Sequence, residues 1–196
     1  MRISRDEHTS RPWRIHEFTP DFRVEDVWTL PATGAGPNDF ARHVRGMLEA
    51  DFEHDVSPIV SALFAIRWKL GEFLGWDRHE EGLGERVPTL RDRLPIDLGA
   101  SAPEVPSGDR FTPLYLLRDE YAAEIANKTM HGVMHLGWVP DGSGGYRGQM
   151  AVLVKPNGAF GHAYMAAIKP FRHLFVYPAL MRFMERSWRR QLQPAA

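Results

Sequence analysis

Two histidines separated by three residues, His131 and His135, are the most conspicuous candidates for chemistry in this sequence. On a helix they would lie on one face and could share a metal ion, and a glutamate after the first would indicate a zinc hydrolase. Gly132 occupies that position, and the neighbours Thr129 and Val133 favour a strand. In a strand the two imidazoles would be about 13 Å apart, at about 3.3 Å per residue. We therefore expect no metal site, and two histidines on the wetter face of a sheet.

Acidic and glycine-rich segments offer weaker candidates. Asp119, Glu120 and Glu124 can be considered as an acid–base group, but that role needs a buried carboxylate with a raised pKa, and an exposed strand turn explains the first two. The run 142–145 (Gly-Ser-Gly-Gly) opens no helix, so it lacks the geometry that cradles a dinucleotide phosphate, and Ser143 lacks the flanking glycines of a nucleophile elbow. We expect this run to form a hairpin turn.

Tight turns divide the second half of the chain into predicted strands. Asn127-Lys128, the segment 141–145 and the segment 155–158 have the Asn, Asp, Gly and Pro content of chain reversals. Between the turns, side chains alternate between an apolar face and a wetter one, as in an antiparallel sheet with one covered side. The predicted strands are Val24 to Leu30, Thr112 to Arg118, Tyr121 to Ala126, Thr129 to Val139, Tyr146 to Val154 and Ala159 to Ile168.

Three helices are predicted around this sheet. Two follow the first strand: one capped by Asn38 or Asp39, and one that starts at Ser57-Pro58 and ends before Gly75. The third, Pro170 to Gln191, closes the chain, and Pro178 inside it should kink or split it. The long segment 76–110 is predicted to be a loop, either a solvated crossover or a lid. This order predicts an α+β helix-grip fold, in which a curved antiparallel sheet of about six strands wraps around a long C-terminal helix.

Composition narrows the functional classes. The net charge of -1 gives no general attraction to nucleic acid, and 43% hydrophobic with 25% charged residues is ordinary for a globular protein. The chain has no cysteine, which excludes disulfides, thiolate nucleophiles and Cys-based metal sites. The polar N-terminus and short apolar runs predict neither a signal peptide nor membrane insertion. We expect a cytoplasmic protein with a flexible lead-in over 1–17 and a single domain over 18–191.

Several short motifs resemble one bacterial family. They are Asp21-Phe22, Glu25-Asp26-Val27-Trp28, Asn38-Asp39-Phe40, Ile125 to His131, and Tyr164 followed by Ile168 to His173. In this order they resemble the bacterial domain of unknown function 2867, which is assigned to the START-like helix-grip (SRPBCC) superfamily. The resemblance implies a hydrophobic ligand cavity and, in some relatives, attachment to dehydrogenase-like Rossmann domains. It carries over no catalytic residues, and we expect no Rossmann half in this sequence.

The leading hypothesis is that the protein binds a small lipophilic molecule between the sheet and the C-terminal helix, without catalysis and without a cofactor. Methionine and aromatic side chains suit such a cavity, because thioethers adapt to irregular apolar shapes and tyrosine hydroxyls orient a polar end. The predicted lining residues are Phe64, Trp68, Tyr115, Met134, Trp138, Met150, Tyr164 and Met181.

Two alternatives remain open. One is a cyclase or dehydratase type of enzyme that uses tyrosine or histidine in the cavity as acid and base. It gains if a histidine or aspartate projects into the cavity with a hydrogen-bonded partner. The other is an interaction module that pairs with a reductase-like partner or with itself as a homodimer, which a large apolar patch on the outer sheet face would favour.

Overall fold

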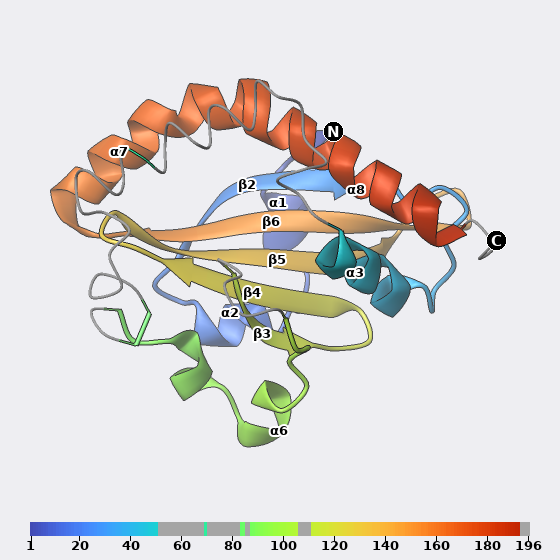
Figure 1. Ribbon diagram of the computed structural model, residues 1–196, viewed down its shortest axis with the longest axis horizontal. Coiled ribbons are helices and arrows are strands. Elements are labelled where there is room, and N and C mark those ends of the chain that lie inside the picture. The colour runs from blue at the N-terminus through green and yellow to red at the C-terminus, as the bar shows by residue number, and fades with distance from the viewer. Residues whose placement is uncertain (51–68, 70–82, 85–86, 106–110, 193–196) are drawn as a thin grey trace.

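Six antiparallel strands form one curved sheet in the computed structural model, which describes residues 1–50, 69, 83–84, 87–105 and 111–192 (Figure 1). Their spatial order is β1-β2-β6-β5-β4-β3. The bounds are β1 Arg2–Ile3, β2 Arg23–Leu30, β3 Thr112–Leu116, β4 Glu120–Ala126, β5 Met130–Pro140 and β6 Tyr146–Pro156. Five of the six predicted strands are confirmed within a few residues. The predicted helix-grip fold class is confirmed as well.

The turns lock the register of the sheet through side-chain hydrogen bonds. Asn127 Oδ1 accepts hydrogen bonds from the backbone N–H groups of Thr129 and Met130, at 2.9 and 3.2 Å, so this Asx turn sets β5 opposite β4. Asp141 Oδ1 accepts in the same way from Ser143 and Gly145 before β6. The first turn reverses without positive φ, because among the described residues only glycines have positive φ.

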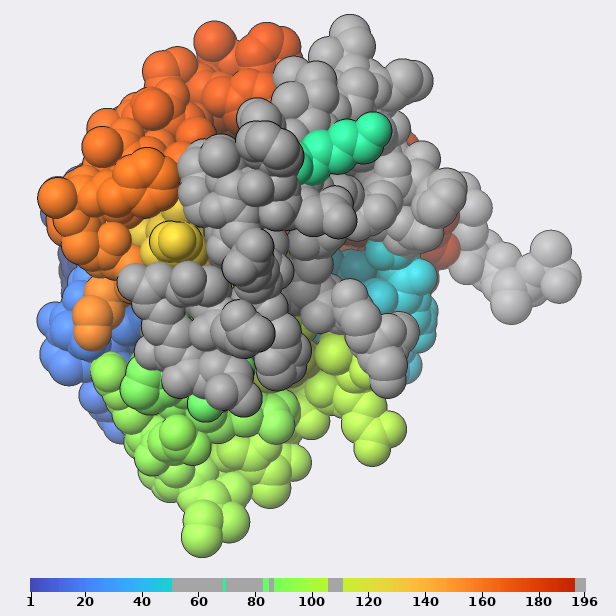
Figure 2. Space-filling model, turned by 60° about the vertical axis from the view of Figure 1, so that its left-hand side comes forward, coloured from blue at the N-terminus to red at the C-terminus, as the bar shows by residue number. Residues whose placement is uncertain are grey.

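The predicted sixth strand is wrong. Residues 159–168 belong to α7 (Gly158–Phe171), the start of the long C-terminal helix, and the sixth strand is β1 at the N-terminus. Four alanines within the segment favour helix, and Asn157-Gly158 begins that helix instead of turning a hairpin. Gly161 permits a close approach here, since a Cβ at this position would lie 2.2 Å from the Thr129 carbonyl oxygen. Figure 2 shows the start of α7, in orange, against the yellow region of the β4–β5 turn.

The C-terminal helix changes its winding over the middle of the sheet. A π-helical segment, η3 (Arg172–Val176), separates α7 from α8 (Tyr177–Leu192), and the Tyr177 N–H bonds the Arg172 carbonyl five residues back. Pro178 follows directly and has no N–H to donate, so the carbonyl four residues before it loses its α-helical partner. The predicted interruption at Pro178 therefore takes the form of a π-turn, a feature often found at functional sites.

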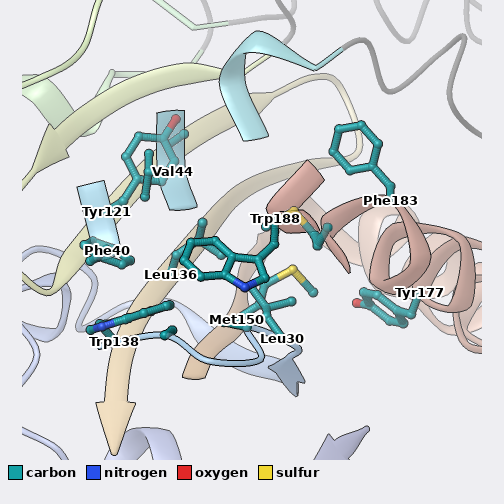
Figure 3. Packing of buried hydrophobic residues seen from close by; sticks show 14 residues of the cluster. Leu30, Phe40, Val44, Tyr121, Leu136, Trp138, Met150, Tyr177, Phe183 and Trp188 are labelled. Carbon is teal, nitrogen blue, oxygen red and sulfur yellow. The ribbon is translucent and has the colours of Figure 1, made fainter. Parts of the chain in front are cut away.

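One hydrophobic core lies between the sheet and α8. Figure 3 shows the Trp188 indole among Leu30, Leu136 and Met150, which come from β2, β5 and β6. α3 (Phe40–Glu49) closes the same side, with Gly46 against Ser187 of α8, and it is the first of the two helices predicted after the first strand. The second, at 57–75, lies outside the described residues apart from Lys69.

A second core covers the opposite sheet face, so the prediction of a wetter face is wrong. The N-terminal segment forms β1, α1 (Asp6–Thr9) and α2 (Ile15–Phe18), and it packs there instead of forming a flexible lead-in. Ile15 is fully buried, and Trp13 lies over Gly137, where a Cβ would come within 2.7 Å of the ring. The short helices η2 (Leu90–Arg93) and α6 (Ile96–Gly99), from the predicted loop 76–110, complete this layer.

We predict that Gly161→Ala destabilises the protein by about 2 kcal/mol, since the new methyl group meets a backbone carbonyl that cannot rotate away. Urea unfolding at pH 7 measures the change. Gly99→Ala is the matched control, because a Cβ there meets no atom within 4 Å and should alter the unfolding free energy by less than about 1 kcal/mol. Equal effects of the two substitutions would contradict the close approach of α7 to the β4–β5 turn.

Candidate functional site

A fully buried carboxylate, Asp26 of β2, is the centre of the candidate site. Its Oδ1 accepts a hydrogen bond from His173 Nε2 at 2.8 Å, and its Oδ2 accepts one from the Tyr177 hydroxyl at 2.9 Å. Two guanidinium groups lie just beyond hydrogen-bond distance, Arg172 Nη2 at 3.6 Å from Oδ2 and Arg2 Nε at 3.6 Å from Oδ1. Asp26 therefore joins the sheet to the junction of η3 and α8.

The side chains around Asp26 differ in how far solvent or a ligand can reach them. Asp26 is 0% exposed, Arg172 is 12% exposed and His173 is 22% exposed. Burial raises the pKa of Tyr177, and the neighbouring Asp26 charge adds to this shift, so the phenol remains a hydrogen-bond donor. His173 is consequently a partly accessible imidazole that is oriented by a buried carboxylate.

An aromatic contact completes the site. Trp28 follows Asp26 by two residues on β2, so both project from the same sheet face. Its ring lies 4.9 Å from the Tyr177 ring and 6.4 Å from the His173 ring. The buried indole Nε1 makes no hydrogen bond within the described part of the chain, and the same holds for Nε and Nη2 of Arg172. The site thus combines a carboxylate whose two oxygens both accept hydrogen bonds with three buried donor nitrogens that make no hydrogen bond to the described residues.

The sheet register continues the site as an apolar row. Asp26 lies opposite Val152 of β6, and Val152 lies opposite Met134 of β5. Neighbouring strands are about 4.8 Å apart, so the row extends about 10 Å from the carboxylate. Val152 and Met134 are only partly buried, and from the helix Leu180 and Met181 pack against the same core. On the helix side of the sheet, the polar cluster around Asp26 is therefore followed directly by the apolar row of Val152 and Met134.

The predicted lining residues divide between several places. Met134, Trp138, Met150 and Met181 belong to or pack on the core under α8, whereas Tyr164 lies half-buried on α7. Tyr115 lies on the opposite face, in the core under the N-terminal segment, so its place in a cavity below the helix is wrong. Phe64 and Trp68 lie outside the described residues.

The histidines singled out by their spacing are buried partners of glutamates. Both lie in β5, as predicted, but on a face covered by other segments. His131 Nε2 lies 2.8 Å from Glu124 Oε2, and Glu124 also accepts hydrogen bonds from Thr89 and from the Leu90 backbone N–H. This carboxylate fastens η2 to the sheet. The prediction that both histidines lie on a solvent-facing side of the sheet is wrong, because η2 and the N-terminal segment cover that side.

His135 takes part in a longer buried chain of hydrogen bonds. Its Nε2 lies 3.2 Å from Glu120 Oε2, and its Nδ1 lies 3.1 Å from His8 Nε2 of α1. Because a carboxylate only accepts, His135 donates to Glu120 and therefore accepts from His8. Glu120 also receives hydrogen bonds from Tyr115 and from the Arg14 backbone N–H, so the predicted exposed turn is wrong for this residue.

Burial and hydrogen bonding keep the two histidines of this hydrogen-bonded row neutral beside an ionised glutamate. Burial lowers the pKa of His135 more than its bond to Glu120 raises it, and burial, followed by the neighbouring His135 and His16, lowers the pKa of His8 to about 2. Burial acts to raise the pKa of Glu120, but hydrogen bonds from His135 and the Arg14 N–H bring it below its usual value. We infer that these hydrogen bonds from Glu120 through His135 to His8 dock the N-terminal segment on the sheet.

A pocket of about 460 Å³ lies at one end of the sheet, where Trp13, Asp119, Glu120, Trp138 and Tyr146 meet. It is a weaker candidate site. His135 and His8, the imidazoles nearest to Glu120, are fully buried, and neither of them lines this pocket. Trp138 already donates its Nε1–H to the Gly36 carbonyl oxygen at 3.0 Å.

The described part of the chain has neither a cluster of metal-ligating side chains nor a membrane-spanning helix. Within it, no group of three or more His, Asp or Glu side chains has the arrangement of a metal site. None of its helices has the length and apolar character of a membrane-spanning segment.

Residues 18–179 match the model of a family described as protein of unknown function, DUF2867. The chain belongs to the DUF2867 family. Neither the curated proteins nor the solved structures gave a match. The match includes all of β2 and extends through η3 to the start of α8, so Asp26, Arg172, His173 and Tyr177 lie within the DUF2867 region.

Sequence reasoning missed the Asp26 site although its signal was present. Two of the motifs that resemble DUF2867, residues 25–28 and 168–173, supply Asp26, Trp28, Arg172 and His173. They are far apart in the chain, and no spacing rule joins a strand residue to a helix residue more than 140 positions later. The motifs indicated membership in DUF2867, and only the fold shows that they meet.

The docking role of His8 predicts acid sensitivity. Its pKa is lowered from 6.5 to about 2 in the folded protein, so the unfolded chain binds an extra proton between these values. Stability is therefore complete above about pH 6.5 and falls as the pH decreases. Urea unfolding at pH 7, 6 and 5 should show His8→Gln losing about 1 kcal/mol less between pH 6 and 5 than the wild type does.

The control is His162→Gln, which changes an exposed histidine on α7 and should leave the wild-type pH dependence intact. A His8→Gln protein with the wild-type slope would contradict the burial of a neutral His8.

Proposed function

We propose that this DUF2867 protein binds a small lipophilic molecule between the sheet and the C-terminal helix. The observation that carries the proposal is a set of apolar side chains that stay only partly buried around the core on this side. Trp28, Val152 and Met134 come from the sheet, and Leu180 and Met181 come from α8. Most of their neighbours, such as Leu136 and Met150, are almost fully buried.

The chemistry of these side chains suits an apolar ligand. Two of the five are methionines, whose flexible thioethers fit irregular shapes, and Trp28 offers an aromatic face beside Tyr177. Covering such residues with a ligand removes apolar surface from water at about 25 cal/mol per Å². The sheet wrapped around one helix also supports our proposal that DUF2867 proteins belong to the START-like helix-grip superfamily.

A second candidate function is acid–base catalysis in the same place. It is favoured by the 2.8 Å hydrogen bond between His173 and Asp26, which places a partly exposed imidazole with a buried carboxylate partner on the helix side of the sheet. A general acid or base requires such an oriented group within reach of the substrate. Chemical conversion of a bound probe, lost in His173→Gln, would favour this candidate.

The interaction-module hypothesis loses one of its supports. It would be favoured by an apolar patch on the outer sheet face, but the N-terminal segment, η2 and α6 cover that face with a second core. Pairing of two copies through other surfaces remains a separate question for a measurement of the oligomeric state.

Thermal unfolding with 1-decanol or decanoic acid tests lipophilic binding. At about 100 times the dissociation constant, a ligand adds about 2.7 kcal/mol, which corresponds to a rise in Tm of about 5 to 10 °C for a chain of this size. Met134→Gln should weaken binding by about tenfold, because it puts an amide into the apolar row.

Ile96→Gln is the matched control, since Ile96 is 93% exposed on α6 and should leave binding unchanged. The proposal is refuted if neither probe raises Tm, or if Met134→Gln binds both probes as tightly as the wild type does.

A further inference from the structure

Three donor nitrogens near Asp26 make no hydrogen bond to the described residues, although each is shielded from solvent. They are Nε and Nη2 of Arg172 and Nε1 of Trp28. A buried donor left without an acceptor loses the hydrogen bond that it makes to water in the unfolded chain, which is unfavourable. Arg172 Nη2 lies 3.6 Å from Asp26 Oδ2 and 3.8 Å from Glu25 Oε2, close enough for ion pairing and too far for good hydrogen bonds. These donors are therefore available to an acceptor on a ligand.

The identity of the two arginine atoms specifies the acceptor. Nε and Nη2 form one edge of the planar guanidinium group, and their N–H bonds point the same way. This edge matches the two oxygens of a carboxylate, which can accept both hydrogen bonds in parallel. A hydroxyl group supplies a single oxygen and cannot match both donors equally well.

The local charge also favours one additional negative group. Among the described residues four guanidinium groups lie here, from Arg2, Arg5, Arg23 and Arg172, against the two carboxylates of Glu25 and Asp26. Arg23 pairs with Glu25, and Arg2 lies 3.6 Å from Asp26, so each carboxylate has its own cation. Arg172 and Arg5, whose Nε donates to the Glu25 carbonyl oxygen at 3.1 Å, add positive charge beyond these two pairs, which an anionic head group would offset.

The apolar row begins at this cluster. Val152 is the cross-strand neighbour of Asp26, and Met134 is the neighbour of Val152 on the next strand. On the helix, Leu180 and Met181 follow Tyr177 by three and four residues, so they share its face. A ligand with an acidic head at Arg172 would meet these apolar side chains of the described strands and helix along the next 10 Å or so.

We propose that the ligand is a lipophilic monocarboxylate. Its carboxylate lies on the Nε and Nη2 edge of Arg172 with Trp28 Nε1 as a third donor, and its apolar tail lies along Val152 and Met134. This inference rests on the proposed function and adds the chemical class of the ligand and its direction in the site.

Isothermal titration with decanoate, 1-decanol and decylamine tests the head group, because the three probes share one tail. The wild type should bind decanoate about tenfold or more tightly than 1-decanol, and decylamine most weakly. Arg172→Gln should lose most of the preference for decanoate over 1-decanol. Arg182→Gln, which changes an exposed arginine one to two turns along α8, should keep it.

Arg172→Lys guards against a variant that fails to fold, because it keeps the charge beside Glu25 and Asp26 but removes the two-donor edge. It should reduce the preference for decanoate by about tenfold as well. Binding of all three probes with equal affinity, or an unchanged preference in both Arg172 variants, would overturn the carboxylate site while leaving lipophilic binding intact. If no probe binds at all, the proposed function itself fails.

Discussion

The arrangement of the C-terminal helix depends on the burial of one negative charge, the Asp26 carboxylate. A buried charge is costly unless it is paired and hydrogen-bonded, and here His173 and Tyr177 donate to both oxygens while Arg172 supplies a counter-charge. All three come from one stretch of helix. The π-turn matters because it closes five residues instead of four, which brings Arg172 as well as His173 toward the side occupied by Tyr177.

The two faces of the sheet bury polar groups for different purposes. On the outer face, Glu120 and Glu124 are fully used by histidines and backbone N–H groups, and the result is a closed layer that fixes the N-terminal segment and η2. On the helix side, the Asp26 carboxylate accepts hydrogen bonds at both oxygens, but the Arg172 and Trp28 donors beside it make none to the described residues. Buried polar groups normally have partners. His8 Nδ1 and Trp13 Nε1 on the outer face also make no hydrogen bond to the described residues, so it is the cluster of three donors beside one carboxylate and an apolar row that distinguishes the helix side.

Turn residues and the alternation of side chains predicted most of the sheet. The segments that cover its outer face are distant in the sequence, and their position could not be predicted. Asn127 and Asp141 act where turn residues are expected, and the alternation in β5 correctly put His131 and Met134 on opposite faces. With the Asn127 turn fixed, His131 opposes Ala126, and Glu124 becomes its diagonal neighbour, so that pair was within reach of sequence reasoning. The helix at 158–171 was missed because Asn-Gly begins helices and hairpins alike. The Asp26 site was missed because its members meet only in the fold.

A double-mutant cycle between Asp26 and Tyr177 tests most directly whether this carboxylate holds the helix on the sheet. Unfolding free energies of the wild type, Asp26→Ala, Tyr177→Phe and the double variant should give a coupling energy of about 1.5 to 3 kcal/mol, as expected for a buried hydrogen bond to a charged group. Additive effects of the two substitutions would show that the hydrogen bond from Tyr177 to Asp26 does not hold the helix on the sheet, and would contradict the account.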